Sequence, residues 1–233
     1  MERGSRNICS LNVLDKAQER ILRDLQTKKG REERGMFIIE GEKFVRDAGD
    51  LVEFTFGPRD TNQFREYVST ETPQTVAAVA RLPKWTVDDL QKYPTIVVLD
   101  GVQDPGNVGT ILRACLGFRA SLVLIESADP TNPKTVRSSA SAILRVPYVT
   151  VHRRDAEEFV TSLARPVYRL ELTQHTILPK DIAPGDVTLI AGSEGQGIRL
   201  DIEGASVKIP HQKALESLNV AMAVGMVLYE RER

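Results

Sequence analysis

From residue 95 onward the sequence alternates short apolar segments with segments of helical pattern, and this alternation restricts the fold more than any other feature. The predicted strands are residues 96–99, 122–125, 148–151, 167–170, 188–191 and 206–209. The predicted helices are residues 108–116, 133–143, 156–163 and 218–231. Short apolar strands that alternate with helices favour a mostly parallel sheet with helices on both faces, which is an α/β fold.

A smaller α/β unit is predicted before residue 80. Leu14, Ala17, Ile21 and Leu25 recur at helical spacing, and Gly30 is a candidate for the end of that helix. Later segments predict strands at residues 36–39, 51–56 and 76–79 and helices at 41–48 and 62–68. A unit of roughly 80 residues is within the usual size of a domain.

The stretch from residue 81 to residue 94 is predicted to be a linker. It contains Pro83 and Pro94, and proline interrupts regular structure. The sequence therefore predicts two domains, residues 1–85 and residues 95–233.

Composition limits the class of protein. The 31 basic and 32 acidic residues give a net charge of −1, so any surface that binds nucleic acid has to be local. Two cysteines and three scattered histidines form no disulfide framework and no metal-ligand spacing, which predicts a protein without a metal. The apolar run at residues 221–229 is too short for a bilayer, and the N-terminus lacks an apolar signal core. We expect a cytoplasmic protein with no membrane contact, although an organellar address stays open.

A polar, glycine-containing run follows the first strand of the larger domain, from Asp100 to Arg113. A P-loop would end in Gly-Lys-Ser/Thr, and this run has no lysine. The glycine spacing also differs from that of a dinucleotide-binding fingerprint. Neither common phosphate-binding motif therefore explains it.

Two further polar runs lie near the C-terminus. Gly192-Ser193-Glu194-Gly195-Gln196-Gly197-Ile198 contains three glycines and a central glutamate, and Glu216-Ser217-Leu218-Asn219 precedes an apolar segment. Ser217 and Asn219 are both candidates to cap the following helix. Small polar groups and free backbone donors suit a nucleotide-like ligand.

These three motifs, in this order, resemble those of the SpoU (TrmH-type) RNA 2′-O-ribose methyltransferases of the SPOUT superfamily. The similarity covers about residues 95–230, and residues 30–80 resemble more weakly the RNA-binding domain found in many such enzymes. The resemblance implies a SPOUT domain with a trefoil knot, S-adenosylmethionine as cofactor, and a homodimer formed through the catalytic domain. The apolar helix after Asn219 fits such an interface.

The resemblance also implies roles for individual residues. Catalytic roles fall on Asn107, Arg113, Glu194, Ser217 and Asn219. Cofactor binding falls on Gly192, Glu194, Gly197, Ile209, Leu218 and Asn219. Asn107 and Arg113 are expected to face the acceptor nucleotide. Because a neutral guanidine is very costly, we expect Arg113 to act as a cation that grips a phosphate and stabilises the developing alkoxide.

One segment departs from the family pattern. Residues 211–215 are His-Gln-Lys-Ala-Leu, where the family usually carries methionine and glycine, so this loop is less flexible. All residues with an implied chemical role are present, and we infer an active enzyme.

The implied activity is methyl transfer to a ribose 2′-hydroxyl of RNA. The attached N-terminal domain favours ribosomal RNA over transfer RNA. A non-catalytic RNA-binding or ribosome-assembly protein and an enzyme that methylates a base remain alternatives. The presence of all five residues with implied catalytic roles argues against the first, and Asn107 with Arg113 favours ribose over a base. RNA contacts are expected from the N-terminal unit and from a basic set. The basic set comprises Lys134, Arg137, Arg145, Arg153 and Arg154.

Overall fold

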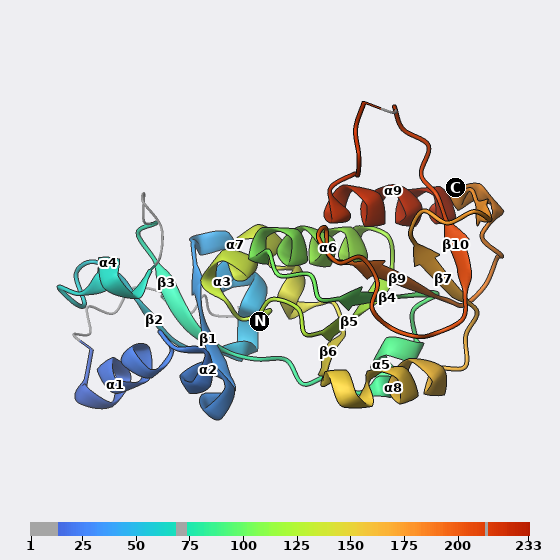
Figure 1. Cartoon of the computed structure of the whole chain (residues 1–233). Helices are drawn as coiled ribbons and strands as arrows, with labels where there is room; N and C mark the ends of the chain where they lie inside the picture. The colour runs from blue at the N-terminus through green and yellow to red at the C-terminus, as the bar shows by residue number, and fades with distance from the viewer. Residues whose placement is uncertain (1–13, 69–73, 213) are drawn as a thin grey trace, which may run out of the picture. The chain divides into compact units, whose positions relative to one another are not determined.

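The computed structural model describes residues 14–68, 74–212 and 214–233. It divides the chain into two compact units, Met1–Leu82 and Pro83–Arg233. Figure 1 shows the course of the chain through both.

The first unit is built on a three-stranded antiparallel sheet in the order β1-β3-β2. Its strands are β1 (Met36–Glu40), β2 (Val52–Phe56) and β3 (Ala77–Arg81). Its helices are α1 (Lys16–Asp24), α2 (Lys28–Arg34), α3 (Glu42–Ala48), the 3₁₀ turn η1 (Gly49–Leu51) and α4 (Phe64–Tyr67). Leu22 and Leu25 of the first helical segment pack with Phe56, Phe64 and Val79 in one apolar core.

The predicted helix end at Gly30 is wrong. Asp24 ends α1, Thr27 caps α2 by accepting a hydrogen bond from the Gly30 N–H at 3.0 Å, and Gly30 lies inside α2. A Cβ atom on Gly30 would lie 1.9 Å from the carbonyl oxygen of Asp24, so glycine is required for the close approach of the two helices. Of these two helices, α2 is the one that ends at a glycine: its C-cap is Gly35, whose φ of 60° is the left-handed conformation that glycine adopts freely.

The stretch predicted as a linker folds into the second unit. It forms α5 (Val87–Gln91), which Thr86 caps by accepting a hydrogen bond from the Asp89 N–H at 3.3 Å. Leu90 of this helix is fully buried against Ile96 and Val98. Five helical residues are too few to show a periodic pattern, so the sequence prediction followed the two prolines and gave a linker instead of a helix.

The second unit contains a seven-stranded sheet in the order β6-β5-β4-β9-β7-β10-β8, and all of its strand pairs are parallel. The strands are β4 (Thr95–Asp100), β5 (Ala120–Ile125), β6 (Tyr148–Val151), β7 (Val167–Leu170), β8 (Thr176–Ile177), β9 (Val187–Gly192) and β10 (Ala205–Val207). The six predicted strands are all present. Only β8 was missed, because two residues carry no pattern.

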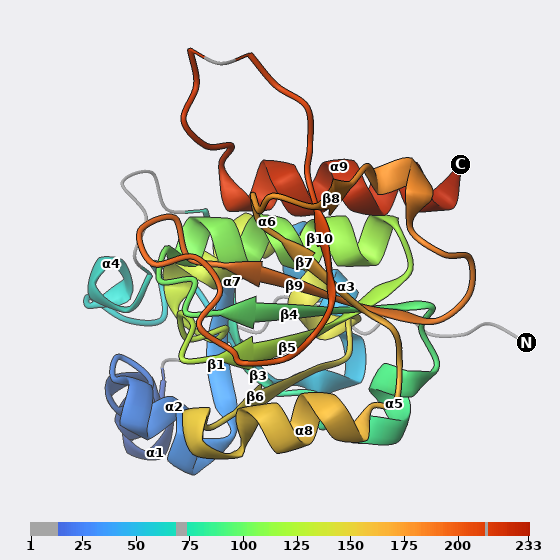
Figure 2. The ribbon, with the colours of Figure 1, turned by 45° about the vertical axis from the view of Figure 1, so that its right-hand side comes forward.

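Helices cover both faces of this sheet. The α-helices are α6 (Pro105–Gly117), α7 (Pro133–Ser139), α8 (Ala156–Ser162) and α9 (Val220–Glu232), and the 3₁₀ turns are η2 (Ala142–Leu144), η3 (Arg153–Asp155) and η4 (Pro179–Asp181). Figures 1 and 2 show α6, α7 and α9 on one face and α5 and α8 on the other. This arrangement confirms the predicted α/β class with a mostly parallel sheet.

Helix α7 is shorter than predicted. It stops at Ser139 because Ala140 and Ser141 have positive φ angles of 46° and 70°, and a right-handed helix cannot continue through such angles.

Within the part of the chain that the structure describes, no helix has the length and apolarity that a bilayer crossing requires.

Candidate active site

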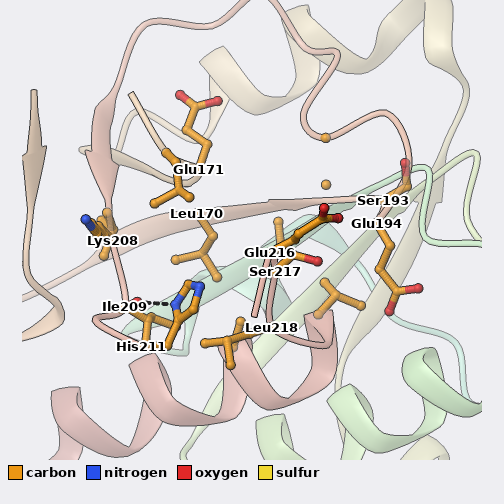
Figure 3. Close-up of a pocket in the computed structure, with 17 residues that line it drawn as sticks. Leu170, Glu171, Ser193, Glu194, Lys208, Ile209, His211, Glu216, Ser217 and Leu218 are labelled. Atoms are coloured by element: carbon orange, nitrogen blue, oxygen red, sulfur yellow. Dashed lines mark hydrogen bonds between the residues drawn. The ribbon is translucent and has the colours of Figure 1, made fainter. Parts of the chain in front are cut away.

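The carboxyl ends of three neighbouring strands border a cavity in the second unit. β7, β9 and β10 are parallel, so their ends lie at one edge of the sheet, where ligands of open α/β sheets bind. The cavity has a volume of about 310 Å³ and is closed on one side by the start of α9. Figure 3 shows its lining residues. Six of the predicted site residues line it: Gly192, Glu194, Gly197, Ile209, Ser217 and Leu218.

The wall of this cavity combines apolar and acidic groups. Leu170, Ile209 and Leu218 lie around it in Figure 3, together with the carboxylates of Glu171 and Glu194. Glu171 accepts a hydrogen bond from Nε of Arg169 at 2.7 Å, and this bond lowers the pKa of its carboxyl group. Lys208 also lines the cavity, so it can take an organic ligand that carries both positive and negative groups.

Gly192, the last residue of β9, is a point where two parts of the chain approach closely. A Cβ atom on Gly192 would lie 2.1 Å from the carbonyl carbon of Gly197 and 2.4 Å from the nitrogen of Ile198. Any side chain here would push the following turn away from the strand end. The glycine is thus a steric requirement of the cavity wall.

Three predicted residues from the three motifs meet in one hydrogen-bonded triangle. Nδ2 of Asn107 donates to Oε1 of Glu194 at 3.1 Å, and Nδ2 of Asn219 donates to the same oxygen at 3.2 Å. Nδ2 of Asn219 also donates to Oδ1 of Asn107 at 2.9 Å. We call these three residues the polar triangle.

Two helix starts position the polar triangle. Asn219 caps α9, because its Oδ1 accepts from the N–H groups of Ala221 and Met222 at 3.0 and 3.2 Å. Asp104 caps α6 by accepting from the Asn107 N–H at 2.9 Å. A hydrogen bond from Lys134 lowers the pKa of the Asp104 carboxyl group, so the cap stays ionised. Ser217, the other predicted cap, instead lies in the cavity wall.

A second, more polar cavity of about 510 Å³ lies on the other side of Glu194. Its wall includes Gln103 and Asn107 from the first motif and Gln196 from the second. Ser193 and Glu194 line both cavities. The polar triangle therefore stands between two adjoining spaces.

Arg113 is not brought to the polar triangle. It follows Asn107 by six residues on α6, which places it about 9 Å further along the helix and about 120° around it. Its side chain is exposed, on the same outward side of the helix as Leu116. Within a single chain, Asn107 lines the polar cavity and Arg113 does not, so the two side chains do not face one common nucleotide site.

The basic set is only partly available to RNA. Arg153 donates hydrogen bonds to the buried carboxylate of Asp100 and to Glu126, so its charge is used inside the protein. Lys134 is paired with Asp104 at 2.9 Å. The RNA contact of Arg153 stays a prediction, and the sequence did not show that two acidic residues would face this side chain.

Other chemistry has little support in the structure. Among residues 14–68, 74–212 and 214–233, no group of three or more histidine, cysteine and acidic side chains could hold a metal ion. Cys115 is fully buried, and burial raises the pKa of its thiol to about 12. A thiolate nucleophile is therefore absent at this position near neutral pH.

Sequence reasoning missed several residues of this region. Gln103 and Gln196 lie in the polar cavity, and Asp100, Glu126 and Arg199 form charged contacts beside it. Gln103 and Gln196 lie within motifs that were identified, but neither was singled out. For the charged residues the sequence offered one indication: Asp100 ends an otherwise apolar strand, and a buried carboxylate at that position needs hydrogen-bond or ionic partners.

The fold and the two cavities define a methyltransferase of the SPOUT type, and comparison with known proteins agrees. The SpoU rRNA Methylase family matches residues 94–229, and the chain belongs to that family. A relative from Bacillus subtilis (strain 168), 23S rRNA (guanosine(2553)-2′-O)-methyltransferase RlmP, is 31% identical over 88% of this chain and 92% of its own length. The predicted family and enzyme class are thereby confirmed.

Solved structures give the same result. An AdoMet-bound rRNA methyltransferase from Sinorhizobium meliloti superposes with a TM-score of 0.79 at 26% identity, over 94% of this chain and 96% of that one. A putative RNA methyltransferase of the TrmH family from Porphyromonas gingivalis gives 0.78 at 28% identity, over 94% and 98%. Both similarities extend over nearly the whole chain and so include the first unit.

Proposed function

We propose that this protein transfers the methyl group of S-adenosylmethionine to a ribose 2′-hydroxyl of ribosomal RNA. The observation that carries the proposal is the polar triangle, which joins the three family motifs between two adjoining cavities. The B. subtilis relative is named as a 23S rRNA 2′-O-methyltransferase, and this name supports ribosomal RNA as the substrate class.

The smaller cavity fits S-adenosylmethionine. Its apolar wall suits the adenine ring, and its carboxylates suit a sulfonium and an ammonium group. When bound, the cofactor supplies a methyl group activated by the positive sulfur. Gly192 and Gly197 let the backbone approach the ligand closely, and Ile209 and Leu218 offer apolar contact and backbone groups. A cofactor-binding role for Asn219 is proposed through its bond to Glu194.

The polar cavity is the proposed place of the acceptor nucleotide. Asn107 and Glu194 line it, and both can hydrogen-bond a ribose hydroxyl. Asn219 holds these two side chains in place, and Ser217 lies on the cofactor side. Positioning supplies much of the rate, because the sulfonium is already a good leaving group.

Arg113 is proposed to act as a permanent cation rather than as a base. Its exposed guanidinium suits a phosphate of bound RNA. The proton of the hydroxyl would then leave to water or to that phosphate.

The experiment combines the purified chain, S-adenosylmethionine with a labelled methyl group, and ribosomal RNA lacking the modification. Label at a ribose 2′-oxygen is the expected result, with transfer lost in the Asn107→Ala control. Label on a base, or on transfer RNA alone, would replace the proposal with one of the alternatives. Calorimetry without RNA tests the cofactor separately, and absence of both heat and thermal stabilisation at millimolar ligand would oppose it.

A homodimer through α9 is also proposed. Met222, Met226 and Tyr229 are 52%, 43% and 55% exposed on this helix, and Leu116 of neighbouring α6 is 42% exposed. Apolar side chains at such spacing form one stripe, which resembles the interface of an obligate dimer. Light scattering at micromolar concentration tests it. A dimer is expected, with monomers for Met222→Glu plus Met226→Glu, whereas an active monomeric parent would contradict it.

The first unit is proposed to bind RNA. A trefoil knot in the second unit and a cytoplasmic location of the protein are two separate proposals. Deleting residues 1–82 should weaken RNA binding while leaving S-adenosylmethionine binding intact, and equal RNA affinity would argue against the role. Cell fractionation tests the location.

A further inference from the structure

Asp100 carries a buried carboxylate with an unusual set of donors. It ends β4, and its side chain has no exposed surface. Oδ2 accepts hydrogen bonds from the backbone N–H groups of Arg199 and Leu200 at 2.6 and 2.9 Å. Oδ1 accepts from the guanidinium of Arg153 and lies 3.9 Å from that of Arg199. Such burial is tolerated only with this degree of pairing.

The backbone of the same residue holds the other end of the following turn. The carbonyl oxygen of Asp100 accepts from the Ser193 N–H at 3.1 Å. Asp100 therefore bonds to residues 193, 199 and 200, at both ends of the turn that follows β9. Within the turn, the Gly197 N–H donates to the carbonyl oxygen of Ser193 at 2.9 Å. We call residues 193–200 the clamped turn.

The clamped turn carries the groups that face both cavities. Ser193 and Glu194 line the two cavities, and Glu194 accepts the hydrogen bonds of the polar triangle. A shift of this turn would move the Glu194 carboxylate relative to both bound substrates. Displacements of about 1 Å can reduce turnover about 100-fold.

A ring of alternating charges surrounds the carboxylate of Asp100. Oε2 of Glu126 accepts from Arg199 at 2.8 Å and from Arg153 at 3.0 Å, so two carboxylates face two guanidinium groups. Gly101 is next in the chain, with a φ of +76°, and a Cβ atom there would lie 3.0 Å from Nη2 of Arg199. The absence of a side chain at Gly101 therefore leaves room for the guanidinium of Arg199.

We propose that Asp100 is a positioning residue that fixes the clamped turn, and through it Glu194, for methyl transfer. The proposal rests on the proposed function for its catalytic consequence, whereas the clamp itself is a property of the protein alone. A carboxylate with backbone donors on one oxygen and a guanidinium on the other orients the turn before any ligand arrives.

The decisive variant is Asp100→Asn in the full chain. Asparagine keeps the shape but has one acceptor oxygen, so the backbone N–H groups of the turn and the guanidinium of Arg153 can no longer both be accepted. We expect S-adenosylmethionine affinity to fall about tenfold and turnover to fall about 100-fold. The matched control is Leu122→Ala, which removes a fully buried side chain of β5 that lines neither cavity. It should lower the melting temperature while keeping cofactor affinity within about twofold.

Cofactor affinity and turnover of Asp100→Asn within about threefold of the parent would overturn the proposal. So would a Leu122→Ala variant of equal melting temperature with equal functional loss, because general destabilisation would then explain both.

Hydrogen exchange of the unsubstituted protein tests the clamp even where Asp100→Asn does not fold. Without ligand, the Arg199 and Leu200 amides should exchange as slowly as strand amides of β4. Exchange as fast as that of exposed loops would refute the clamp. Protected amides in a protein that binds no S-adenosylmethionine would instead refute the proposed function and leave the clamp standing.

Discussion

Nδ2 of Asn219 donates a hydrogen bond to Oδ1 of Asn107 at 2.9 Å, joining residues 112 positions apart in the sequence. Each asparagine lies at the start of a helix, α9 for Asn219 and α6 for Asn107. Figures 1 and 2 show these helices side by side. The contact therefore links the first motif to the third, and Glu194 of the second motif bonds to both.

Asn219→Ser separates the two functions of this side chain. Serine caps a helix as well as asparagine does, so the free energy of unfolding should change by only a few tenths of a kcal/mol. Its shorter hydroxyl has a single O–H and cannot replace the amide NH₂ that bonds both Asn107 and Glu194. Turnover should fall about 100-fold. Asn219→Ala should show the same loss and lower stability by about 1 kcal/mol. Urea unfolding and methyl-transfer assays measure both, and a fully active serine variant would remove Asn219 from the mechanism.

Asn107→Ala should abolish methyl transfer and leave S-adenosylmethionine binding nearly unchanged. The side chain lines the polar cavity but not the cavity assigned to the cofactor. A group that acts mainly in the transition state lowers turnover more than ground-state affinity. Calorimetry for the cofactor and label transfer for the reaction distinguish the two, and an equal loss in both would assign Asn107 to cofactor binding instead.

Arg113→Ala should also remove activity and spare cofactor affinity, because the residue lies outside both cavities. Arg113→Lys keeps the charge but loses the planar fork that grips a phosphate. If geometry matters, the lysine variant should remain badly impaired, whereas near-full activity would mean that a positive charge is sufficient. An alanine variant with full activity would refute the role of Arg113.

Gly192→Ala should disrupt the cofactor cavity, since its Cβ atom would lie 2.1 Å from Gly197. Overpacking of this kind costs about 1–3 kcal/mol, and the displaced turn should reduce S-adenosylmethionine affinity by at least about tenfold. Gly117→Ala is the control, because its Cβ atom would meet nothing within 4 Å. Unchanged affinity in Gly192→Ala would show that the turn tolerates the displacement.

The charged ring predicts a pH dependence of stability. Hydrogen bonds from Arg199 and Arg153 lower the pKa of the Glu126 carboxyl group from its ordinary value of 4.5. Its contribution is thus complete above about pH 4.5 and is lost as the pH falls through the lowered value. Urea midpoints below pH 4.5 should fall less steeply for Glu126→Gln than for the parent. Parallel curves would show that Glu126 adds no such stability.

The sequence by itself determined most of the local elements of the larger domain and, through resemblance, the family. Strand-forming apolar runs such as residues 122–125 need only local alternation and neighbouring turns, so they were predicted from pattern. The resemblance of the motifs to the family pointed to Asn107, Glu194 and Asn219, and Asn219 also carried a local signature as a helix cap.

Tertiary structure decided what depends on residues far apart in the chain. Residue 30 has to be glycine because the Asp24 carbonyl approaches it, and Arg153 is held in ion pairs because Asp100 and Glu126 face it. The clamped turn is fixed by a residue about one hundred positions earlier in the chain. These hydrogen bonds and ion pairs form only when strand ends that are far apart in the sequence meet at one edge of the sheet. The local sequence around each residue does not show which distant residues it will meet.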